Sequence, residues 1–101
     1  MERVVQRAEE RSRYEISVDG VVAGFADFRE VDGAISLPHT VVETAYEGEG
    51  VGSQLVREAL EDLRVRGAKV LPLCSFVAAW IDQHEDFADL VDTEALARRR
   101  G

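Results

Sequence analysis

One stretch of the sequence decides the fold: Val41-Val42-Glu43-Thr44-Ala45-Tyr46-Glu47-Gly48-Glu49-Gly50-Val51-Gly52-Ser53-Gln54-Leu55-Val56, which reads as strand, glycine turn and helix. Glycine at positions 48, 50 and 52 lets the backbone adopt positive φ and approach a ligand closely. A turn without side chains at a helix start presents free N–H groups at the positive end of the helix dipole. The pattern indicates a diphosphate site, although glycine turns that only start a helix are also common.

Two common phosphate-binding loops do not fit these residues. A Walker A loop requires lysine followed by serine or threonine after its last glycine, whereas Gly52 is followed by Ser53 and Gln54. The dinucleotide fingerprint requires Gly-x-Gly-x-x-Gly after a first strand. Here the last interval is too short, and three strand-like segments come before the glycines. Both interpretations are therefore excluded.

Upstream of the glycines, the sequence predicts an antiparallel meander of three strands. Apolar and polar residues alternate over 13–18, the pattern of a half-buried strand. Asp19-Gly20 is a signal for a two-residue hairpin turn, and a second strand follows over 21–29. Asp32-Gly33 offers another such turn before a third strand begins.

Downstream of the glycines, the sequence predicts a helical crossover to a parallel strand. Gly67 is placed to end the helix, and residues 69–73 form a short apolar strand. A helical crossover joins parallel strands, so this strand is expected beside residues 35–43. Ser75 is a good N-cap for a second helix, and a last helix is expected from Thr93. The apolar stripe of the crossover helix consists of Val51, Leu55, Val56, Ala59, Leu60 and Leu63.

The predicted fold class is therefore α+β, as a single domain over residues 1–101. Three antiparallel strands and one parallel strand form a mixed sheet of four strands, with helices packed on it. Residues 1–12 are charged and lack periodicity, so we expect a loose lead-in. Residues 97–101 are likewise expected to be loosely ordered.

Pro38 and Pro72 each lie inside a strand-like segment, and the two segments are expected to be neighbours. A proline cannot donate a ladder hydrogen bond, so it marks an edge, a bulge or the end of pairing. The two prolines are either independent edge or bulge residues, or they mark a place where the strands splay apart. The second interpretation accounts for both at once and predicts a V-shaped cleft.

The glycine segment resembles the coenzyme A pyrophosphate loop of the GNAT acyltransferase superfamily, usually written Gln/Arg-x-x-Gly-x-Gly/Ala. The matching residues are Gly50-Val51-Gly52, with Glu47 before them and an amphipathic helix after them. The chain is most similar to the very small single-domain GNAT-like proteins that carry His-Thr before the loop and Pro-x-Cys after the helix. Those motifs here are His39-Thr40 and Pro72-Leu73-Cys74, and the resemblance extends from residue 35 to residue 91.

The resemblance implies an N-acyltransferase that uses acetyl-CoA as cosubstrate and needs no metal. The pantetheine arm inserts like an extra strand between the two splayed strands, and a backbone N–H of Val41 or Val42 polarises the thioester carbonyl. The residues expected to bind the coenzyme are Val41, Val42, Glu47, Gly48, Glu49, Gly50, Val51, Gly52, Ser53 and Phe76.

Cys74 and His39 are the candidate catalytic residues. A free cysteine is usually a small buried hydrophobe, but a thiol directly before a helix start has its thiolate favoured by the dipole. The resemblance implies an acyl-acceptor role for Cys74, although most GNAT enzymes transfer the acyl group directly. It also implies a catalytic role for His39, as a base near neutral pH that deprotonates the attacking amine or activates Cys74. The alternative is a strand histidine bonded to a carbonyl.

Several residues depart from the superfamily pattern. Many GNAT enzymes have a tyrosine acid on the helix that here carries Trp80, and an indole cannot serve efficiently as that acid. Glu47 and Glu49 stand where polar or basic residues are more natural beside a diphosphate. No segment matches the first helices and last strands of a full GNAT domain, so we expect a shallow, open site.

The formal net charge of −8 disfavours nucleic acid and anionic membranes as partners, and favours an amine or a basic peptide as acceptor. It also disfavours coenzyme A, so nearby cations are expected to assist the diphosphate. A single cysteine and an N-terminus without an apolar segment suit a cytoplasmic protein, expected as a monomer or weak homodimer. The candidate cations are Arg57, Arg64, Arg66 and Lys69.

Three functions are compatible with these observations. The leading one is an acetyl-CoA-dependent N-acyltransferase, working by direct attack or through an acyl-cysteine. The alternatives are a coenzyme A-binding module with little or no catalysis and an interaction protein that keeps only the architecture. Coenzyme A binding, followed by turnover with a panel of amines, separates the three.

Overall fold

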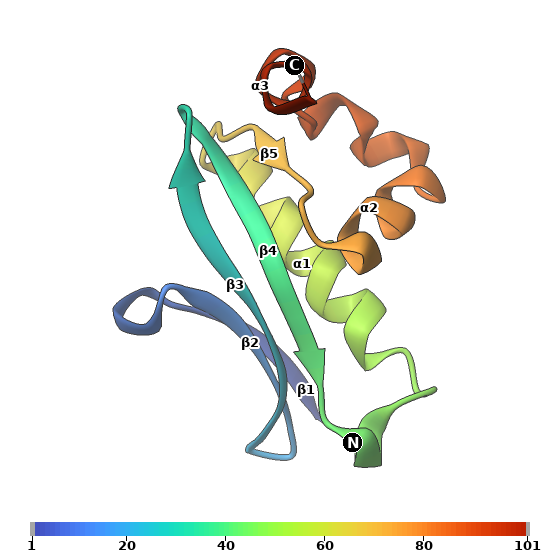
Figure 1. The fold of residues 1–101 in the computed structure, drawn as a ribbon. Helices are drawn as coiled ribbons and strands as arrows, with labels where there is room; N and C mark the ends of the chain where they lie inside the picture. Colours follow the sequence, from blue (N-terminus) through green and yellow to red (C-terminus); the bar gives the residue numbers. More distant parts are fainter. Residues whose placement is uncertain (1, 101) are drawn as a thin grey trace.

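A computed structural model describes residues 2–100 as a five-stranded sheet with helices on one face (Figure 1). The strand order is β1-β2-β3-β4-β5, and every neighbouring pair is antiparallel except β4 and β5. The α+β fold class and the mixed sheet are confirmed, but the sheet has one strand more than the sequence predicted. The strands are β1 (Arg3–Ala8), β2 (Arg13–Val18), β3 (Val21–Val31), β4 (Ala34–Val42) and β5 (Val70–Leu71). The helices are α1 (Val51–Val65), α2 (Ser75–Asp82) and α3 (Thr93–Arg100), with 3-10 turns η1 (Glu9–Arg11), η2 (Thr44–Tyr46) and η3 (Glu85–Leu90).

The prediction of a loose lead-in was wrong, because residues 3–8 form the edge strand β1. Its inward-facing positions include Arg7, whose guanidinium lies 4.1 Å from the ring centroid of Phe28. The same group donates a hydrogen bond of 2.7 Å to the Tyr14 hydroxyl. A long arginine that packs its stem inward in this way hides the apolar alternation that normally identifies a strand. Helix α3 likewise continues to Arg100 where a loose end was expected, while Met1 and Gly101 lie outside the described residues.

The predicted turns are confirmed by the backbone angles. Asp19 and Asp32 have φ of 50° and 53°, and the glycines that follow them have φ of 85° and 81°. Positive φ at both central residues is the requirement of a type I′ hairpin turn, which joins β2 to β3 and β3 to β4. Gly67 has φ of 74° and ends α1 as predicted.

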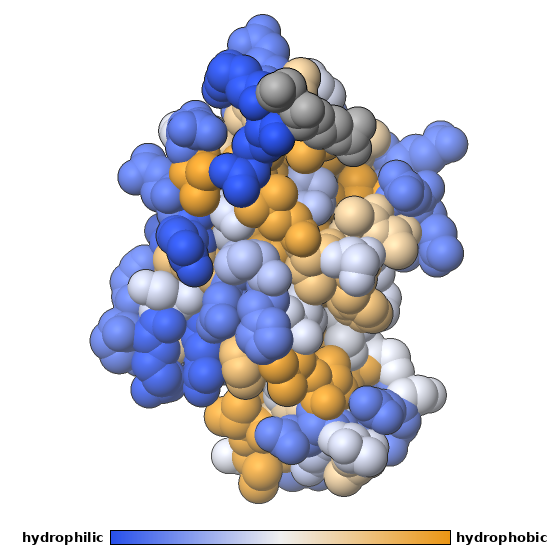
Figure 2. Space-filling view, viewed as in Figure 1, coloured by the Kyte–Doolittle hydropathy of each residue, from blue (hydrophilic) through white to orange (hydrophobic). Residues whose placement is uncertain are grey.

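The core lies between the sheet and α1. The apolar stripe of α1 is fully buried against inward-facing residues of the sheet such as Ile16 and Leu37. Figure 1 shows α1 and α2 on the same side of the sheet, and on the viewed face separate apolar areas alternate with hydrophilic ones (Figure 2). Among residues 2–100, no helix is long and apolar enough to cross a membrane.

Strands β4 and β5 pair for only two residues and then part. Ile35 pairs with Val70 and Ser36 pairs with Leu71, and the pairing ends there. The N–H of Leu73 then bonds to the carbonyl of Leu71 at 2.9 Å, so a three-residue turn centred on the proline carries the chain away from β4. The predicted cleft between these strands is confirmed.

Candidate active site

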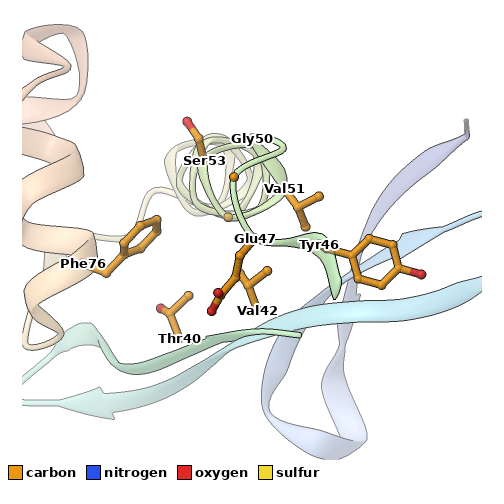
Figure 3. A pocket seen from close by; sticks show the side chains of 10 residues that line it. Thr40, Val42, Tyr46, Glu47, Gly50, Val51, Ser53 and Phe76 are labelled. Atoms are coloured by element: carbon orange, nitrogen blue, oxygen red, sulfur yellow. The ribbon is translucent and has the colours of Figure 1, made fainter. Parts of the chain in front are cut away.

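A cavity of about 420 Å³ opens where β4 and β5 have parted. In Figure 3, Thr40 and Val42 rise from β4, Phe76 reaches in from α2, and Ser53 lies at the start of α1. The cavity is therefore bounded by a strand edge, a helix start and a second helix. Its lining residues are Thr40, Val42, Tyr46, Glu47, Gly48, Gly50, Val51, Gly52, Ser53 and Phe76.

The structure brings most of the predicted coenzyme-binding residues together at this cavity, with Val41 and Glu49 as the exceptions. Two lining residues were missed by the sequence analysis, Thr40 and Tyr46. Thr40 shares a strand face with Val42, so the alternation of side chains along β4 was the signal that could have found it. Tyr46 carried no such signal, since it lies in the irregular 3-10 turn before the glycines.

The backbone of Val41 is turned toward β3 and not toward the cavity. The N–H of Glu43 bonds to the carbonyl of Ala23 at 2.8 Å. Hydrogen-bonded pairs alternate along an antiparallel ladder, so Val41, two residues earlier, is bonded to β3 as well. The N–H groups of Thr40 and Val42 consequently face the gap on the other side of β4.

The turn before α1 leaves its N–H groups free. Gly48 and Gly50 have φ of 81° and 78°, a conformation that other residues rarely adopt. The first intrahelical bond runs from the N–H of Gln54 to the carbonyl of Gly50 at 3.1 Å. No side chain of the described residues caps this helix. The N–H groups of the first turn therefore point, unpaired by the helix, at the positive end of its dipole.

Gly52 permits a close approach between α1 and the opposite walls of the cavity. A Cβ atom at this position would lie 3.1 Å from Cζ of Phe76 and 3.2 Å from Cγ2 of Val42. Both separations are shorter than ordinary carbon contacts, so any larger residue would push the walls apart. The Phe76 side chain is 45% exposed, which makes it the wall with more freedom to move.

Cys74 lies at the N-cap of α2, beside β4. Burial alone would raise the pKa of its thiol, but the backbone N–H groups of Val77 and Phe76, together with the hydroxyl and N–H of Thr40, outweigh burial and lower that pKa below its usual value. The Thr40 Oγ1 is itself buried and forms no well-aligned hydrogen bond within residues 2–100. The hydroxyl therefore lies near the thiol, in a loose contact that favours the thiolate.

His39 does not lie beside Cys74, contrary to the arrangement that its activating role requires. Its ring packs 6.1 Å, centroid to centroid, from Phe25 on the sheet face opposite α1. The cause is a β-bulge, in which Leu37 and Pro38 together oppose one residue of β3. Without the bulge, His39 would share the α1-facing side with Leu37, but the extra residue turns Thr40 toward the cavity instead.

A comparison with known protein families decides where this arrangement belongs. The model of the GCN5-related N-acetyltransferase family matches residues 13–90. The chain belongs to this family. The match begins at β2, continues through the parted strands and the glycine turn, and ends after α2, so it contains every residue that lines the cavity.

Two solved structures illustrate the likeness to this GCN5-related chain. An NMR solution structure of a GCN5-like protein from Staphylococcus aureus superposes with a TM-score of 0.68 at 23% identity, over 87% of this chain and 86% of that chain. It shows that the two share a fold. A structure of AAC(6′)-Iy in complex with the bisubstrate analogue CoA-S-monomethyl-acetylneamine gives a TM-score of 0.49 at 19% identity, over 75% of this chain and 59% of that chain. No curated protein matches the sequence significantly.

Trp80 takes a structural place in this member of the family. Its Nε1–H donates a hydrogen bond of 2.8 Å to Oγ of Ser53, which ties α2 to the start of α1. The indole is 6% exposed and stacks on the ring of His84 at 3.7 Å between centroids. The His84 ring is half-buried, and its Nδ1 lies 2.6 Å from the Trp80 carbonyl.

Most of the cations expected near the diphosphate are elsewhere. Arg64 and Arg66 lie at the far end of α1, roughly 18 Å from Gly52 at 1.5 Å per residue. They are engaged there with Asp89 at 2.8 Å and Asp62 at 2.6 Å. Lys69 donates to the Asp89 carbonyl at 2.7 Å. The expectation that these three cations assist the diphosphate was therefore wrong.

Arg57 is the remaining cation of that set, and its guanidinium stacks on aromatic rings. Its guanidinium lies over the rings of Trp80 and Phe87, 5.2 Å and 5.6 Å from their centroids. It sits two turns into α1, beyond the glycine turn. Its stacking supports the packing of α2 against α1.

Proposed function

We propose that this chain is an acetyl-CoA-dependent N-acetyltransferase that acts on an amine. The observation that carries the proposal is that backbone N–H groups of a strand edge and of a helix start face one cavity. The edge of β4 at Thr40 and Val42 leads directly to the free N–H groups of the glycine turn and the first turn of α1. An extended pantetheine arm matches the strand edge, and a diphosphate matches the helix start.

The residues present fit such a ligand. The cavity volume of about 420 Å³ is within the range of small-molecule sites. A side chain at Gly52 would close the passage between α1 and the opposite walls, so glycine keeps it open. The buried hydroxyl of Thr40 has no well-aligned partner among the described residues, and a polar group of the ligand would satisfy it.

The chemistry proposed for the chain is polarisation and positioning. Bound acetyl-CoA supplies an activated acyl group in its thioester. The N–H of Val42 faces the gap, so it is placed to donate to the carbonyl oxygen, where negative charge develops as an amine attacks. Of the two residues that the sequence suggested for this role, Val42 is favoured, because the N–H of Val41 is bonded to β3. His39 stays a candidate base only by acting from the opposite face of the sheet.

A variant of the proposal passes the acyl group through Cys74. The thiolate attacks the thioester carbon, the bond to the sulfur of coenzyme A breaks, and coenzyme A leaves as a thiolate. An amine then attacks the acyl-cysteine, the Cys74 thiolate is released, and the amine proton passes to solvent. The lowered pKa of Cys74 and the Thr40 donors beside it support the first step.

The acceptor is proposed to be a cationic small-molecule amine or a basic peptide. With 20 acidic residues against 12 basic ones, the net charge of −8 attracts positively charged partners. The amine must lose a proton before it attacks, and the surrounding negative charge opposes that loss. Activity is therefore expected to rise with pH up to the pKa of the acceptor.

Calorimetry with coenzyme A, followed by an assay of thiol release from acetyl-CoA with a panel of amines, tests the proposal. We expect binding together with amine-dependent release of free coenzyme A. Mass spectrometry of the protein with acetyl-CoA alone separates the two routes, since only the Cys74 route adds an acetyl group that Cys74→Ala abolishes. Absence of coenzyme A binding by the folded protein would overturn the proposal.

A second candidate function is a coenzyme A-binding module with little or no catalysis. The hydrogen bond of Trp80 to Ser53 favours it, because α2 then offers no side-chain acid to the departing thiolate. The position of His39 on the far face of the sheet favours it as well. Binding of coenzyme A without turnover over the whole amine panel would select this function.

A further inference from the structure

The glycine turn carries negatively charged side chains, although its proposed ligand is an anion. Glu47 and Glu49 flank Gly48, and both carboxylates are exposed. A diphosphate on the adjacent N–H groups would experience repulsion from these two charges. The basic residues on the far half of α1 are engaged in other contacts, as described above. The turn therefore needs positive charge from another part of the chain.

Arg3 of β1 is the cation that contacts this turn. Its Nη2 donates a hydrogen bond of 2.9 Å to the backbone carbonyl of Glu49. Its Nη1 lies 4.0 Å from the position of a Cβ at Gly50, a residue that lines the cavity. Arg3 is 46 positions away in sequence, and it reaches the turn only because β1 adds to the edge of β2.

The start of β1 is anchored so that Arg3 is held in this place. Two hydrogen bonds join Glu2 to the β2–β3 turn, one from its N–H to Oδ1 of Asp19 at 2.8 Å and one from the Asp19 N–H to the Glu2 carbonyl at 2.7 Å. Arg3 itself pairs with Val18. The guanidinium has five N–H donors, and the structure records one of them in a hydrogen bond within residues 2–100.

We propose that Arg3 is a binding determinant for the diphosphate of the coenzyme, supplying the positive charge that the glycine turn lacks. The inference rests on the proposed function and adds a residue from outside the matched family segment, which begins at residue 13. Arg3 acts in two ways. It holds the turn through the Glu49 carbonyl, and its charge offsets the carboxylates of Glu47 and Glu49 beside the bound anion.

The test measures dissociation constants for coenzyme A, dephospho-coenzyme A and pantetheine by calorimetry, with Arg3→Gln, Arg3→Lys and the parent protein. We expect Arg3→Gln to weaken coenzyme A binding about tenfold, and Arg3→Lys to retain most of the affinity because it keeps the charge. Dephospho-coenzyme A should show the same loss, since it keeps the diphosphate. Pantetheine has no diphosphate and should bind the three proteins equally.

Arg29→Gln is the matched control, because it also removes one exposed arginine. Arg29 lies near the C-terminal end of β3, where it pairs with Ser36. It changes the net charge equally and should leave the coenzyme A affinity unchanged. The salt dependence of binding should become shallower for Arg3→Gln but not for Arg29→Gln.

The outcomes separate this inference from the proposed function. If the parent protein fails to bind coenzyme A, the proposed function has failed. If the parent binds and Arg3→Gln binds equally well, the inference alone is overturned. An equal loss for pantetheine would show that Arg3 only supports the fold of the whole site, and a loss confined to coenzyme A would assign Arg3 to the 3′-phosphate. Either result also overturns the inference.

Discussion

Helix α1 is closed by the protein at its C-terminal end and left open at its N-terminal end. At the C-terminal end, the N–H of Gly67 bonds to the carbonyl of Arg64 and the N–H of Ala68 bonds to that of Leu63, both at 3.0 Å. These two bonds form a Schellman motif. Asp62 accepts hydrogen bonds of 2.6 Å from both the Tyr14 hydroxyl and the Arg66 guanidinium.

The N-terminal end has none of these completions within the described residues. It has no side-chain cap, its preceding residue Gly50 is in the left-handed region, and a cavity adjoins it. Buried or half-buried polar groups are normally satisfied, so an end left without partners is a place for a ligand. Mutations at the two ends should therefore differ in their effect on coenzyme A binding. Those at the C-terminal end should cost stability alone, and those at the N-terminal end should also cost binding.

The largest effect is expected at Gly52. Gly52→Val should weaken coenzyme A binding by more than tenfold, or about 1.4 kcal/mol, because its side chain enters the cavity. It should also cost about 1–3 kcal/mol of stability, since the new atoms overlap Phe76 and Val42. Calorimetry and urea unfolding measure the two effects.

A second variant separates these two causes for Gly52. One of the two short contacts, at 3.1 Å, is with the Phe76 ring, so adding Phe76→Ala should restore part of the stability of Gly52→Val. It should not restore coenzyme A binding. A folded Gly52→Val protein with the affinity of the parent would contradict the assignment of the glycine turn.

A smaller effect, on stability alone, is expected at the closed end. Asp62→Ala removes the acceptor of the Tyr14 and Arg66 hydrogen bonds and should cost about 1–3 kcal/mol in urea unfolding. Burial raises the pKa of Tyr14 to about 12, so its hydroxyl stays protonated and loses its acceptor. Coenzyme A affinity should not change, and a loss comparable to that of Gly52→Val would erase the distinction between the two ends.

The same carboxylate predicts a pH dependence of stability. Burial alone would raise the pKa of Asp62, but hydrogen bonds from Tyr14 and Arg66 outweigh it and lower that pKa. The folded state therefore binds this proton more weakly than the unfolded state does. Its contribution is present above the unfolded pKa of about 3.9 and is lost as pH falls through the lower folded value. The free energy of unfolding, measured with urea, should fall less between neutral and acidic pH for Asp62→Asn than for the parent.

A change in reactivity without a large change in stability is expected at Thr40. Thr40→Val removes a hydroxyl that lowers the pKa of Cys74, so that pKa should move back upward. The pH midpoint of alkylation by iodoacetamide should rise accordingly, and bound coenzyme A should protect the thiol in the parent protein. A midpoint that does not move would show that the hydroxyl has no influence on the thiolate.

The smallest effect is expected at His39. Because its ring lies on the other face of the sheet against Phe25, His39→Ala should leave the alkylation midpoint of Cys74 where it is in the parent. The rate of acetyl transfer by the same variant is then compared with that of the parent. A slower rate with unchanged Cys74 reactivity would mark His39 as a base acting from the open face. A shifted alkylation midpoint would instead place the imidazole near the thiol.

The sequence predicted the elements whose signals are local. The two Asp-Gly turns, the α1 stripe and the Gly67 ending each depend on a few adjacent residues, and each is confirmed. The parting of β4 from β5 was also predictable, because two prolines in neighbouring segments forbid continued pairing. Gly48, Gly50, Gly52 and Ser53 also line the cavity, as predicted, because their position depends on a few adjacent residues at the helix start.

The main failures depend on contacts between distant residues. Strand β1 was missed because Arg7 faces inward and is stabilised by Tyr14 and Phe28, which the local pattern does not reveal. The exchange of His39 for Thr40 at the cavity arises from the bulge at residues 37–38, and one extra residue reverses the face of every residue after it. The contact of Arg3 with the turn likewise exists only after β1 has joined the sheet.

An NMR titration of the ¹⁵N-labelled protein with coenzyme A tests the central distinction between the two ends of α1 most directly. The account predicts that the backbone N–H signals of residues 48–53, together with those of Thr40 and Val42, shift on binding. The signals of residues 62–68 at the closed end should stay in place. Shifts concentrated at the closed end, or no shift at the glycine turn when coenzyme A is saturating, would contradict the account.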